Sequence, residues 1–212
     1  MRVISTNISA AKTIVWQGKE VQTGIFKEPV KQPLILEKTD VLGDVVVDRK
    51  YHGGIDKACY LFSADHYPFW KERYPDLNWN YGMFGENLTV KNCDETNVNI
   101  GDVYEVGTAT IQVSQPRQPC FKLGVRFNDQ TVLKDFINQP YPGIYVRVLK
   151  SGEVRVGDDF RLVSNNPQGI SVSEVFKVLY HKPYEKDLLD KVLAEEFLAE
   201  GCKSYIRKKY TL

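Results

Sequence analysis

Short apolar runs rich in β-branched and aromatic residues, separated by polar stretches, recur along the first two-thirds of the chain. Such runs favour strands, because branched and aromatic side chains pack well on the surface of a sheet. Gly-Asp pairs punctuate the runs, and this pair suits tight turns between strands. The expected strands span residues 2–8, 33–36, 45–47, 58–62, 108–114 and 144–149, with turns at 43–44, 101–102 and 157–158.

Two segments interrupt this pattern with helical signals. Residues 65–74 follow Ser63, which suits a helix N-cap, and end at Pro75. Residues 130–137 carry apolar side chains at helical spacing, namely Val132, Leu133, Phe136 and Ile137. We therefore expect two short helices inside a region that is otherwise rich in strands.

The pattern becomes helical after residues 165–169, a polar stretch with proline and glycine that predicts a linker. Ser171 and Glu174 have the spacing of a capping box. The first expected helix has apolar positions at Val175, Val178 and Leu179. The second has them at Leu188, Leu189, Val192, Leu193 and Phe197, and Gly201 ends it. A third, basic helix is expected at 203–210. The sequence predicts a β-rich domain at 1–165 and a three-helix tail at 170–212.

Composition and charge exclude several classes of protein. Of 212 residues, 42% are hydrophobic and 26% are charged, which is typical of a folded globular chain. The net charge of +1 argues against a dedicated nucleic-acid-binding protein, which usually carries a clustered basic excess. No run has the length of a signal peptide or a membrane span, so we expect a cytoplasmic protein without a membrane partner.

The cysteines have no spacing typical of a zinc site or a disulfide framework. Cys59 lies in an apolar run and is expected in the core, Cys93 in a turn and Cys202 at the start of the last helix. Each cysteine is therefore considered separately, and only Cys120 has neighbours that indicate chemistry.

Residues 48–57 concentrate cations, a histidine and a Gly-Gly pair in ten positions. Glycines let backbone approach a ligand, and exposed N–H groups together with Arg and Lys favour phosphate. The alternative is a charged, solvated hairpin turn. Residues 82–88, which include Glu86 and Asn87, are either a second loop that lines a pocket or a simple turn. Residues 16–19 could line the same cleft but are better explained as a surface hairpin.

Cys120 lies in a segment framed by two prolines, at residues 114–123. Pro116 and Pro119 stop the preceding strand and stiffen the loop. Arg117 and Lys122 are close in sequence, and nearby cations favour the thiolate, which is the nucleophile and soft-metal ligand. The alternative is a buried structural cysteine.

Together these segments resemble the MOSC family, the domain named for the C-terminus of molybdenum cofactor sulfurase, and within it the YiiM type. The motifs that carry the resemblance are DRKYHGGIDKACYLF at 48–62, FGENLTV at 84–90, IGDVYEVG at 100–107 and SQPRQPCFKL at 114–123. A helical tail after the domain is also a YiiM-type feature. The resemblance implies a mostly β, barrel-like domain with a cleft, followed by a small C-terminal three-helix subdomain.

The resemblance also implies an activity. Family reductases hold a molybdenum cofactor (molybdopterin) with one cysteine, here Cys120, and YiiM-type proteins are linked to detoxification of N-hydroxylated purines such as 6-hydroxylaminopurine. The implied reaction reduces N–OH to N–H and water. Related sulfurases bind pyridoxal phosphate. Catalytic roles fall on Cys120 and, as proton donor, His52, and the expected cofactor-binding residues are Arg49, Lys50, His52, Gly53, Gly54, Asp56, Lys57, Asn87 and Arg117.

Other functions remain open from the residues alone. Cys120 would equally suit a carrier of persulfide sulfur. The basic loop with its aromatic residues would suit a non-catalytic module that binds anions or single-stranded nucleic acid. The near-zero net charge disfavours this binding module. The chain has no iron–sulfur, dinucleotide or flavin motif, so a reductase would need an external electron donor. The basic tail could dock that partner, although packing explains it better.

Overall fold

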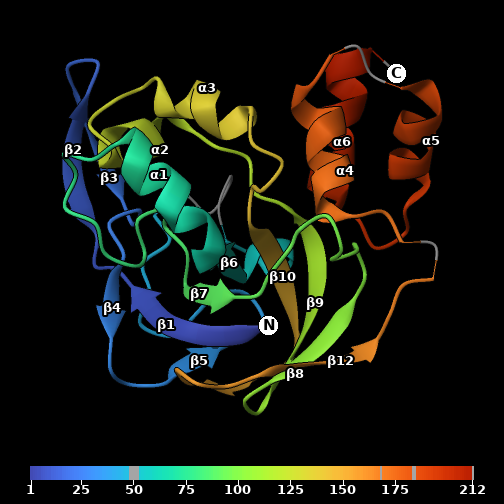
Figure 1. Ribbon diagram of the computed structural model, residues 1–212, viewed down its shortest axis with the longest axis horizontal. Helices are drawn as coiled ribbons and strands as arrows, with labels where there is room; N and C mark the ends of the chain where they lie inside the picture. The colour runs from blue at the N-terminus through green and yellow to red at the C-terminus, as the bar shows by residue number, and fades with distance from the viewer. Residues whose placement is uncertain (48–52, 168, 183–184, 212) are drawn as a thin grey trace.

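A computed structural model describes residues 1–47, 53–167, 169–182 and 185–211. Its centre is an eight-stranded sheet in the order β12-β8-β9-β10-β6-β7-β1-β4 (Figure 1). The strands are β1 (Arg2–Ile8), β4 (Glu28–Val30), β6 (Cys59–Ser63), β7 (Leu88–Lys91), β8 (Val103–Val106), β9 (Ala109–Pro116), β10 (Ile144–Lys150) and β12 (Phe160–Ser164). Two ribbons accompany it, β5 (Leu34–Leu36) with β11 (Gly152–Val154), and β2 (Lys12–Trp16) with β3 (Lys19–Thr23).

The sheet curls but does not close, so the expected barrel is corrected to an open, barrel-like sheet. β4 pairs with only the last residues of β1, which are Thr6–Ile8. The first residues of β1 instead meet the segment leading into β12, where the Val3 amide donates to the Asp158 carbonyl at 2.9 Å. Among the described strands, β12 pairs with β8 and β4 pairs with β1, and no ladder joins these two edge strands to each other.

Most of the expected strands are confirmed, and one is wrong. Residues 45–47 form no strand, because the Val45 amide donates to the Ser9 carbonyl in a loop and none of the described strands pairs with them. The Gly-Asp turns are confirmed, with Gly101 at φ 89° and Gly157 at φ 98°, a backbone region that favours glycine. The other five expected strands all have pairing partners, whereas the paired strands β4 and β11 were not predicted.

Three short helices cover one end of the sheet (Figure 1). α1 (Tyr67–Arg73), after the 3₁₀ turn Ala64–His66, and α3 (Val132–Ile137) confirm the two expected helices, whereas α2 (Phe121–Arg126) was not expected. They enclose an aromatic core in which Phe62 and Phe84 stack at 4.0 Å between ring centroids. This core includes Phe84 of the loop before β7 and Leu123 of α2, so it supports segments that carry the candidate chemistry.

The C-terminal helices are α4 (Val172–Tyr180), α5 (Lys186–Ala194) and α6 (Glu200–Tyr210). The capping box is confirmed, since the Glu174 amide donates to Ser171 Oγ at 3.2 Å and the Ser171 amide donates to the Glu174 carboxylate at 2.8 Å. Two details were wrong: α5 ends before Phe197, and Gly201 lies in the first turn of α6. The reason is tertiary, because the Ala199 amide donates to the Ser114 carbonyl of β9 at 3.2 Å and fixes the turn there.

The segment expected as a linker is fixed to the sheet in its described part. Asn166 is buried; its amide donates to Asp102 at 2.9 Å and its side chain donates to the Ile100 carbonyl at 2.8 Å. Val172 and Val175 of α4 belong to the same apolar core as Ile111 of β9. The division into domains 1–165 and 170–212 stays a prediction. In the described parts of the chain, no helix combines the length and apolar character needed to cross a bilayer.

Candidate functional site

Cys120 lies where β9 gives way to α2. The strand ends at Pro116, and the loop that follows places Cys120 in an extended conformation directly before the helix. Its carbonyl accepts the Leu123 amide at 2.9 Å, which fixes the loop onto the first turn of α2. The side chain is half-buried rather than enclosed in the core. The expected stiff, accessible cysteine loop is therefore present.

The other three cysteines are buried. Burial raises the pKa of the Cys202 thiol to about 12, against a smaller opposing effect of Lys57. Burial also raises the pKa values of Cys59 and Cys93 well above their ordinary range. These thiols stay protonated at neutral pH, which leaves Cys120 as the accessible thiol of the described chain.

A narrow cleft of about 90 Å³ opens beside Cys120. It is bounded by the end of β3, by residues 44–47, by the 3₁₀ turn Ile55–Lys57 and by the loop before β7. Of the residues expected from the sequence, it brings together Gly53, Lys57, Asn87, Arg117 and Cys120. It also includes Lys122, the second cation expected beside Cys120, and polar residues to which no sequence signal assigned a role in a site, namely Lys27, Asp44, Tyr60 and Tyr145.

The guanidinium of Arg117 is buried in this cleft between aromatic rings. Its central carbon lies 5.3 Å from the ring centroids of both Tyr60 and Phe136. Among the described residues, its Nη1 atom is buried without a hydrogen-bond partner. A buried cationic nitrogen without a partner is costly, so this atom is suited to receive an acceptor from a ligand.

Lys57 and Tyr145 form another wall of the cleft. Burial lowers the pKa of Lys57, with Cys202 and Asp56 opposing the shift. Its ammonium lies 6.0 Å from the centroid of the Tyr145 ring. Burial raises the pKa of Tyr145 to about 12, so its phenol stays neutral at physiological pH. Lys57 is therefore a half-buried cation that releases its proton more readily than a surface lysine.

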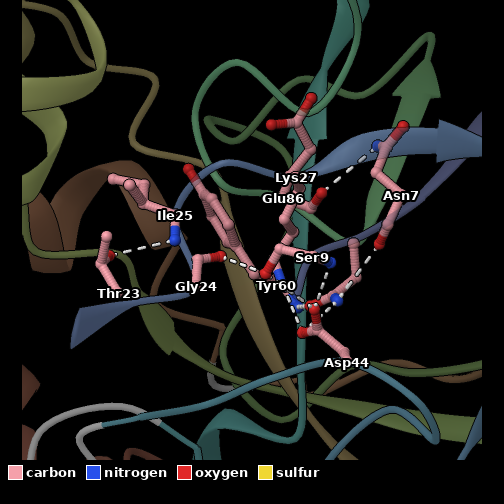
Figure 2. Close-up of polar contacts among 10 residues, drawn as sticks. Asn7, Ser9, Thr23, Gly24, Ile25, Lys27, Asp44, Tyr60 and Glu86 are labelled. Carbon is pink, nitrogen blue, oxygen red and sulfur yellow. Dashed lines mark hydrogen bonds and ion pairs between the residues drawn. The ribbon is translucent and has the colours of Figure 1, made fainter. Parts of the chain in front are cut away.

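A buried polar network forms the floor of the cleft (Figure 2). Lys27 makes an ion pair with Asp44, whose other carboxylate oxygen accepts the Ser9 amide at 2.9 Å. The Asn87 side chain donates to Asp44 at 2.9 Å and accepts the Tyr60 amide at 3.2 Å. Asn87 thus orients Asp44 and the start of β6, and its expected role in binding cofactor stays a prediction.

Glu86 supports the loop from behind without lining the cleft. Its carboxylate accepts the Gly82 amide at 2.9 Å, the Phe84 amide at 3.0 Å and the Thr89 hydroxyl at 2.8 Å, as well as the Tyr67 hydroxyl. Burial raises its pKa, with these donors opposing the shift. This carboxylate fixes the 82–88 loop, whose Phe84, Gly85 and Asn87 line the cleft, so the expectation of a pocket loop is confirmed.

Two expected cofactor residues lie beside the cleft and do not line it. Asp56 accepts Arg147 Nε at 2.5 Å, and the same arginine donates to the Phe197 carbonyl at 2.8 Å. Asp56 therefore helps to hold the C-terminal segment against the sheet. Gly54 caps the turn Ile55–Lys57, and its amide donates to the Thr39 carbonyl at 3.0 Å.

Three expected residues, Arg49, Lys50 and His52, lie outside the described residues. Within the described ranges, no three His, Cys, Asp or Glu side chains come together as a metal site.

The hairpin at Trp16 is confirmed as a turn between β2 and β3, and Trp16 stacks on Phe121 at 4.8 Å between centroids.

Comparison with known proteins gives two family matches that divide the chain. The pattern described as the MOSC domain matches residues 48–161. The pattern described as the YiiM-like, 3-alpha helix domain matches residues 170–209. The first match contains the Cys120 loop and most of the cleft, and the second covers α4 to α6.

Individual proteins agree with these matches. The chain is 38% identical to the uncharacterized protein YflK of Bacillus subtilis, over 98% of this chain and 93% of that protein. It is 36% identical to a protein named reductase from Gibberella moniliformis, over 81% of this chain but 31% of the fungal protein. The crystal structure of YiiM from Geobacillus stearothermophilus superposes with a TM-score of 0.82 at 30% identity, covering 98% of both chains.

Proposed function

The chain belongs to the MOSC domain family, with a YiiM-like three-helix domain at its C-terminus, and we propose that it is a molybdenum-cofactor-dependent reductase of N-hydroxylated compounds. The observation that carries the proposal is the buried Arg117, whose Nη1 faces no acceptor of the described chain, in the cleft beside Cys120. An anionic ligand would supply the missing acceptor.

The charge of the cleft fits the phosphate of a pterin cofactor. Its described lining contains one carboxylate, Asp44, and four cationic side chains, which are Lys27, Lys57, Arg117 and Lys122. This local excess contrasts with the near-neutral chain, whose net charge is +1. Arginine binds phosphate through directed hydrogen bonds, and lysines add point charges. Arg117 and Lys57 are therefore the described residues proposed to hold the cofactor, together with Arg49 and Lys50 from the sequence.

Cys120 is proposed as the ligand of the molybdenum. A half-buried thiol on a loop fixed by proline and by the first turn of α2 can present its sulfur to a soft metal without rearranging the core. When bound, the cofactor supplies two electrons to the N–OH group. Two protons are also taken up, so that the N–O bond gives N–H and water.

The chain itself must deliver those protons and position the substrate. His52 stays the proton donor proposed from the sequence. Lys57 is a second candidate, because burial lowers its pKa and it lines the same cleft as Cys120. After donating, either group would take up a new proton from solvent.

An external electron-donor protein completes the proposal. The fungal relative named reductase is a longer protein, of which the matched region makes up 31%. Its name therefore describes a chain with much additional sequence. We expect the present chain to receive electrons from a separate reductase protein.

The test is molybdenum and pterin content in protein made by a host that synthesises the cofactor. Wild type should hold about one equivalent of molybdenum, and Cys120→Ala should lose the metal. Cys93→Ala is the matched control, because it removes a buried thiol that does not line the cleft. A wild-type protein without metal or pterin would refute the proposal.

A persulfide carrier is the second candidate, because the same accessible thiol would suit it. Incubation with a cysteine desulfurase and its substrate should then add about 32 Da to Cys120, in an adduct that thiols remove. Molybdenum loading without this adduct favours the reductase, and the adduct without loading favours the carrier.

A further inference from the structure

Lys57 stands at the boundary of two cavities. A second cavity, of about 360 Å³, opens beside Cys120, and the tail contributes Tyr180 and Tyr205 to it. Its volume lies in the range of small-molecule sites, which is roughly 300–1,000 Å³. The residues that it shares with the narrow cleft are Lys57, Cys120, Lys122 and Tyr145. Two of these four are lysines, so the charge that a ligand meets in either cavity depends on how the lysines are held.

Of the two shared lysines, only Lys57 directly follows an acidic residue in the chain. Asp56 and Lys57 belong to the same 3₁₀ turn, Ile55–Lys57. Burial lowers the pKa of Lys57, and the charges of Cys202 and Asp56 oppose this shift. If the Asp56 carboxylate turned onto the ammonium, it would cancel much of the charge that Lys57 presents to the cavities. The direction of the Asp56 side chain is therefore important for the site.

Arg147 of β10 determines that direction. Its Nε atom donates to the Asp56 carboxylate at 2.5 Å. Its Nη1 atom donates to the Phe197 carbonyl at 2.8 Å and to the Gln112 side chain at 3.2 Å. The donors of a guanidinium form a rigid, planar fork, so an arginine bound to three acceptors has little freedom to move. Arg147 therefore holds the Asp56 carboxylate toward the C-terminal segment that contains Phe197.

The backbone of the turn is fixed independently of Arg147. Ser114 Oγ lies 2.5 Å from the Asp56 carbonyl and 2.8 Å from the Tyr145 carbonyl, and it binds both strand β10 and the turn. The Lys57 amide donates to the Gly54 carbonyl at 3.0 Å. Replacing Arg147 should therefore release the Asp56 side chain while the backbone of the turn stays in place.

We propose that Arg147 is a positioning residue, which binds the Asp56 carboxylate so that Asp56 does not pair with Lys57, and which thereby directs the charge of Lys57 to the ligands of the two cavities. This role rests on the proposed function, in which Lys57 helps to hold the cofactor phosphate and can supply a proton. Because Arg147 also binds the Phe197 carbonyl, it links the charge of the site to the position of the C-terminal segment.

The direct test is acetylation of Lys57 by acetic anhydride in the full-length, cofactor-free protein, read by peptide mass spectrometry. Only the uncharged amine reacts, so the rate at pH 8 reports how strongly the surroundings hold the proton on Lys57. In Arg147→Gln the Asp56 carboxylate is released to Lys57. We expect acetylation to slow about tenfold, the size of effect that a neighbouring opposite charge has on protonation.

Removing the carboxylate as well should reverse the effect. The double variant Arg147→Gln with Asp56→Asn should be acetylated at least as fast as wild type. A loosened tail would not give this pattern, because both variants lack the bond from Arg147 to Phe197. Arg147→Lys keeps a charge beside Asp56 and should stay within twofold of wild type. Arg155→Gln breaks an exposed ion pair with Glu153 and is the matched control, which should change nothing.

Cofactor content connects this role to the proposed function. In protein from a host that makes the cofactor, Arg147→Gln should retain about half of the wild-type pterin or less, because a neutralised lysine attracts phosphate less strongly, and the double variant should recover it. Unchanged acetylation in Arg147→Gln, or slow acetylation that persists in the double variant, overturns the inference. If the acetylation pattern holds but wild type carries no pterin, the reductase proposal fails and the positioning role of Arg147 stands.

Discussion

The guanidinium of Arg117 lies 5.3 Å from the centroid of the Tyr60 ring, and Arg117 is buried in the same loop that carries Cys120. The ring faces stabilise the cation without consuming its N–H donors. One of those donors, on Nη1, meets no acceptor among the described residues. The charge is thus held in place before any ligand arrives, which lowers the cost of binding an anion there.

Replacing Arg117 should impair cofactor retention. Arg117→Met keeps the length of the side chain and removes its charge, so the loss of a charge-assisted hydrogen bond should weaken cofactor binding by about 1.5–3 kcal/mol. The measurement is pterin and molybdenum content after purification. Arg126→Met is the control, since Arg126 also lies against an aromatic ring with a buried, unpartnered nitrogen but lines neither cavity. Equal pterin content in the two variants would contradict the assignment.

Alkylation should distinguish Cys120 from the other cysteines. Iodoacetamide at pH 8 should modify Cys120 in the folded, cofactor-free protein, because burial keeps the thiols of Cys59, Cys93 and Cys202 protonated and out of contact with the reagent. Peptide mass spectrometry reads the sites. All four cysteines should react in urea, which serves as the control. Early labelling of a buried cysteine would show that the fold opens more readily than its packing indicates.

Glu86 should be essential to the stability of the pocket loop. All the side-chain and backbone groups that bind the Glu86 carboxylate are hydrogen-bond donors. Glu86→Gln replaces one accepting oxygen with an NH₂ group, which is itself a donor, so we expect the free energy of unfolding to fall by about 1–3 kcal/mol. Urea denaturation measures the change. Glu196→Gln, at an exposed position, should change stability by less than about 0.5 kcal/mol. Similar midpoints for the two variants would argue against the hydrogen-bond network.

The link between α1 and α3 should depend on acidity. Burial alone would raise the pKa of Asp135, but hydrogen bonds from Arg73 and Tyr74 outweigh it and lower the pKa below its ordinary value of 3.8. A carboxyl group whose pKa is lowered by folding stabilises the fold at pH values above its ordinary pKa. This stabilisation is lost as the pH falls through the lowered pKa.

Asp135→Asn should therefore lower the free energy of unfolding by about 0.5–1 kcal/mol at pH 7. The expected change is modest because the Arg73 side chain is 58% exposed, so water screens the ion pair. The difference from wild type should vanish in strong acid. Denaturation at a series of pH values tests this expectation, and a difference that persists unchanged at low pH would contradict it.

Local signals predicted those parts of the molecule whose cause is local. The capping box of Ser171 and Glu174 starts α4 because both partners lie within one helical turn. Cys120 and Arg117 share one proline-framed segment, so their proximity was visible without a fold. The family motifs were visible for the same reason, and both family matches agree with them.

Sequence patterns did not predict other features, because the residues that interact there are far apart in the sequence. Residues 45–47 have strand-forming side chains, but no strand in the described part of the chain pairs with them. No sequence signal gave Lys27, Asp44 or Tyr145 a role in a site, and only the fold brings them into one cleft. Asp56 belongs to a promising motif, but its carboxylate is paired with Arg147, 91 residues away in sequence.

The amino-acid sequence by itself therefore determined a β-rich region followed by three helices, the family, and Cys120 as the cysteine whose neighbours indicate chemistry, since each depends on neighbouring residues. The tertiary structure alone decided that the sheet stays open, that Arg117 is buried without an acceptor, and that Tyr205 of the tail reaches the cavity beside Cys120. Burial and long-range contacts arise only when distant segments pack, so no local pattern encodes them.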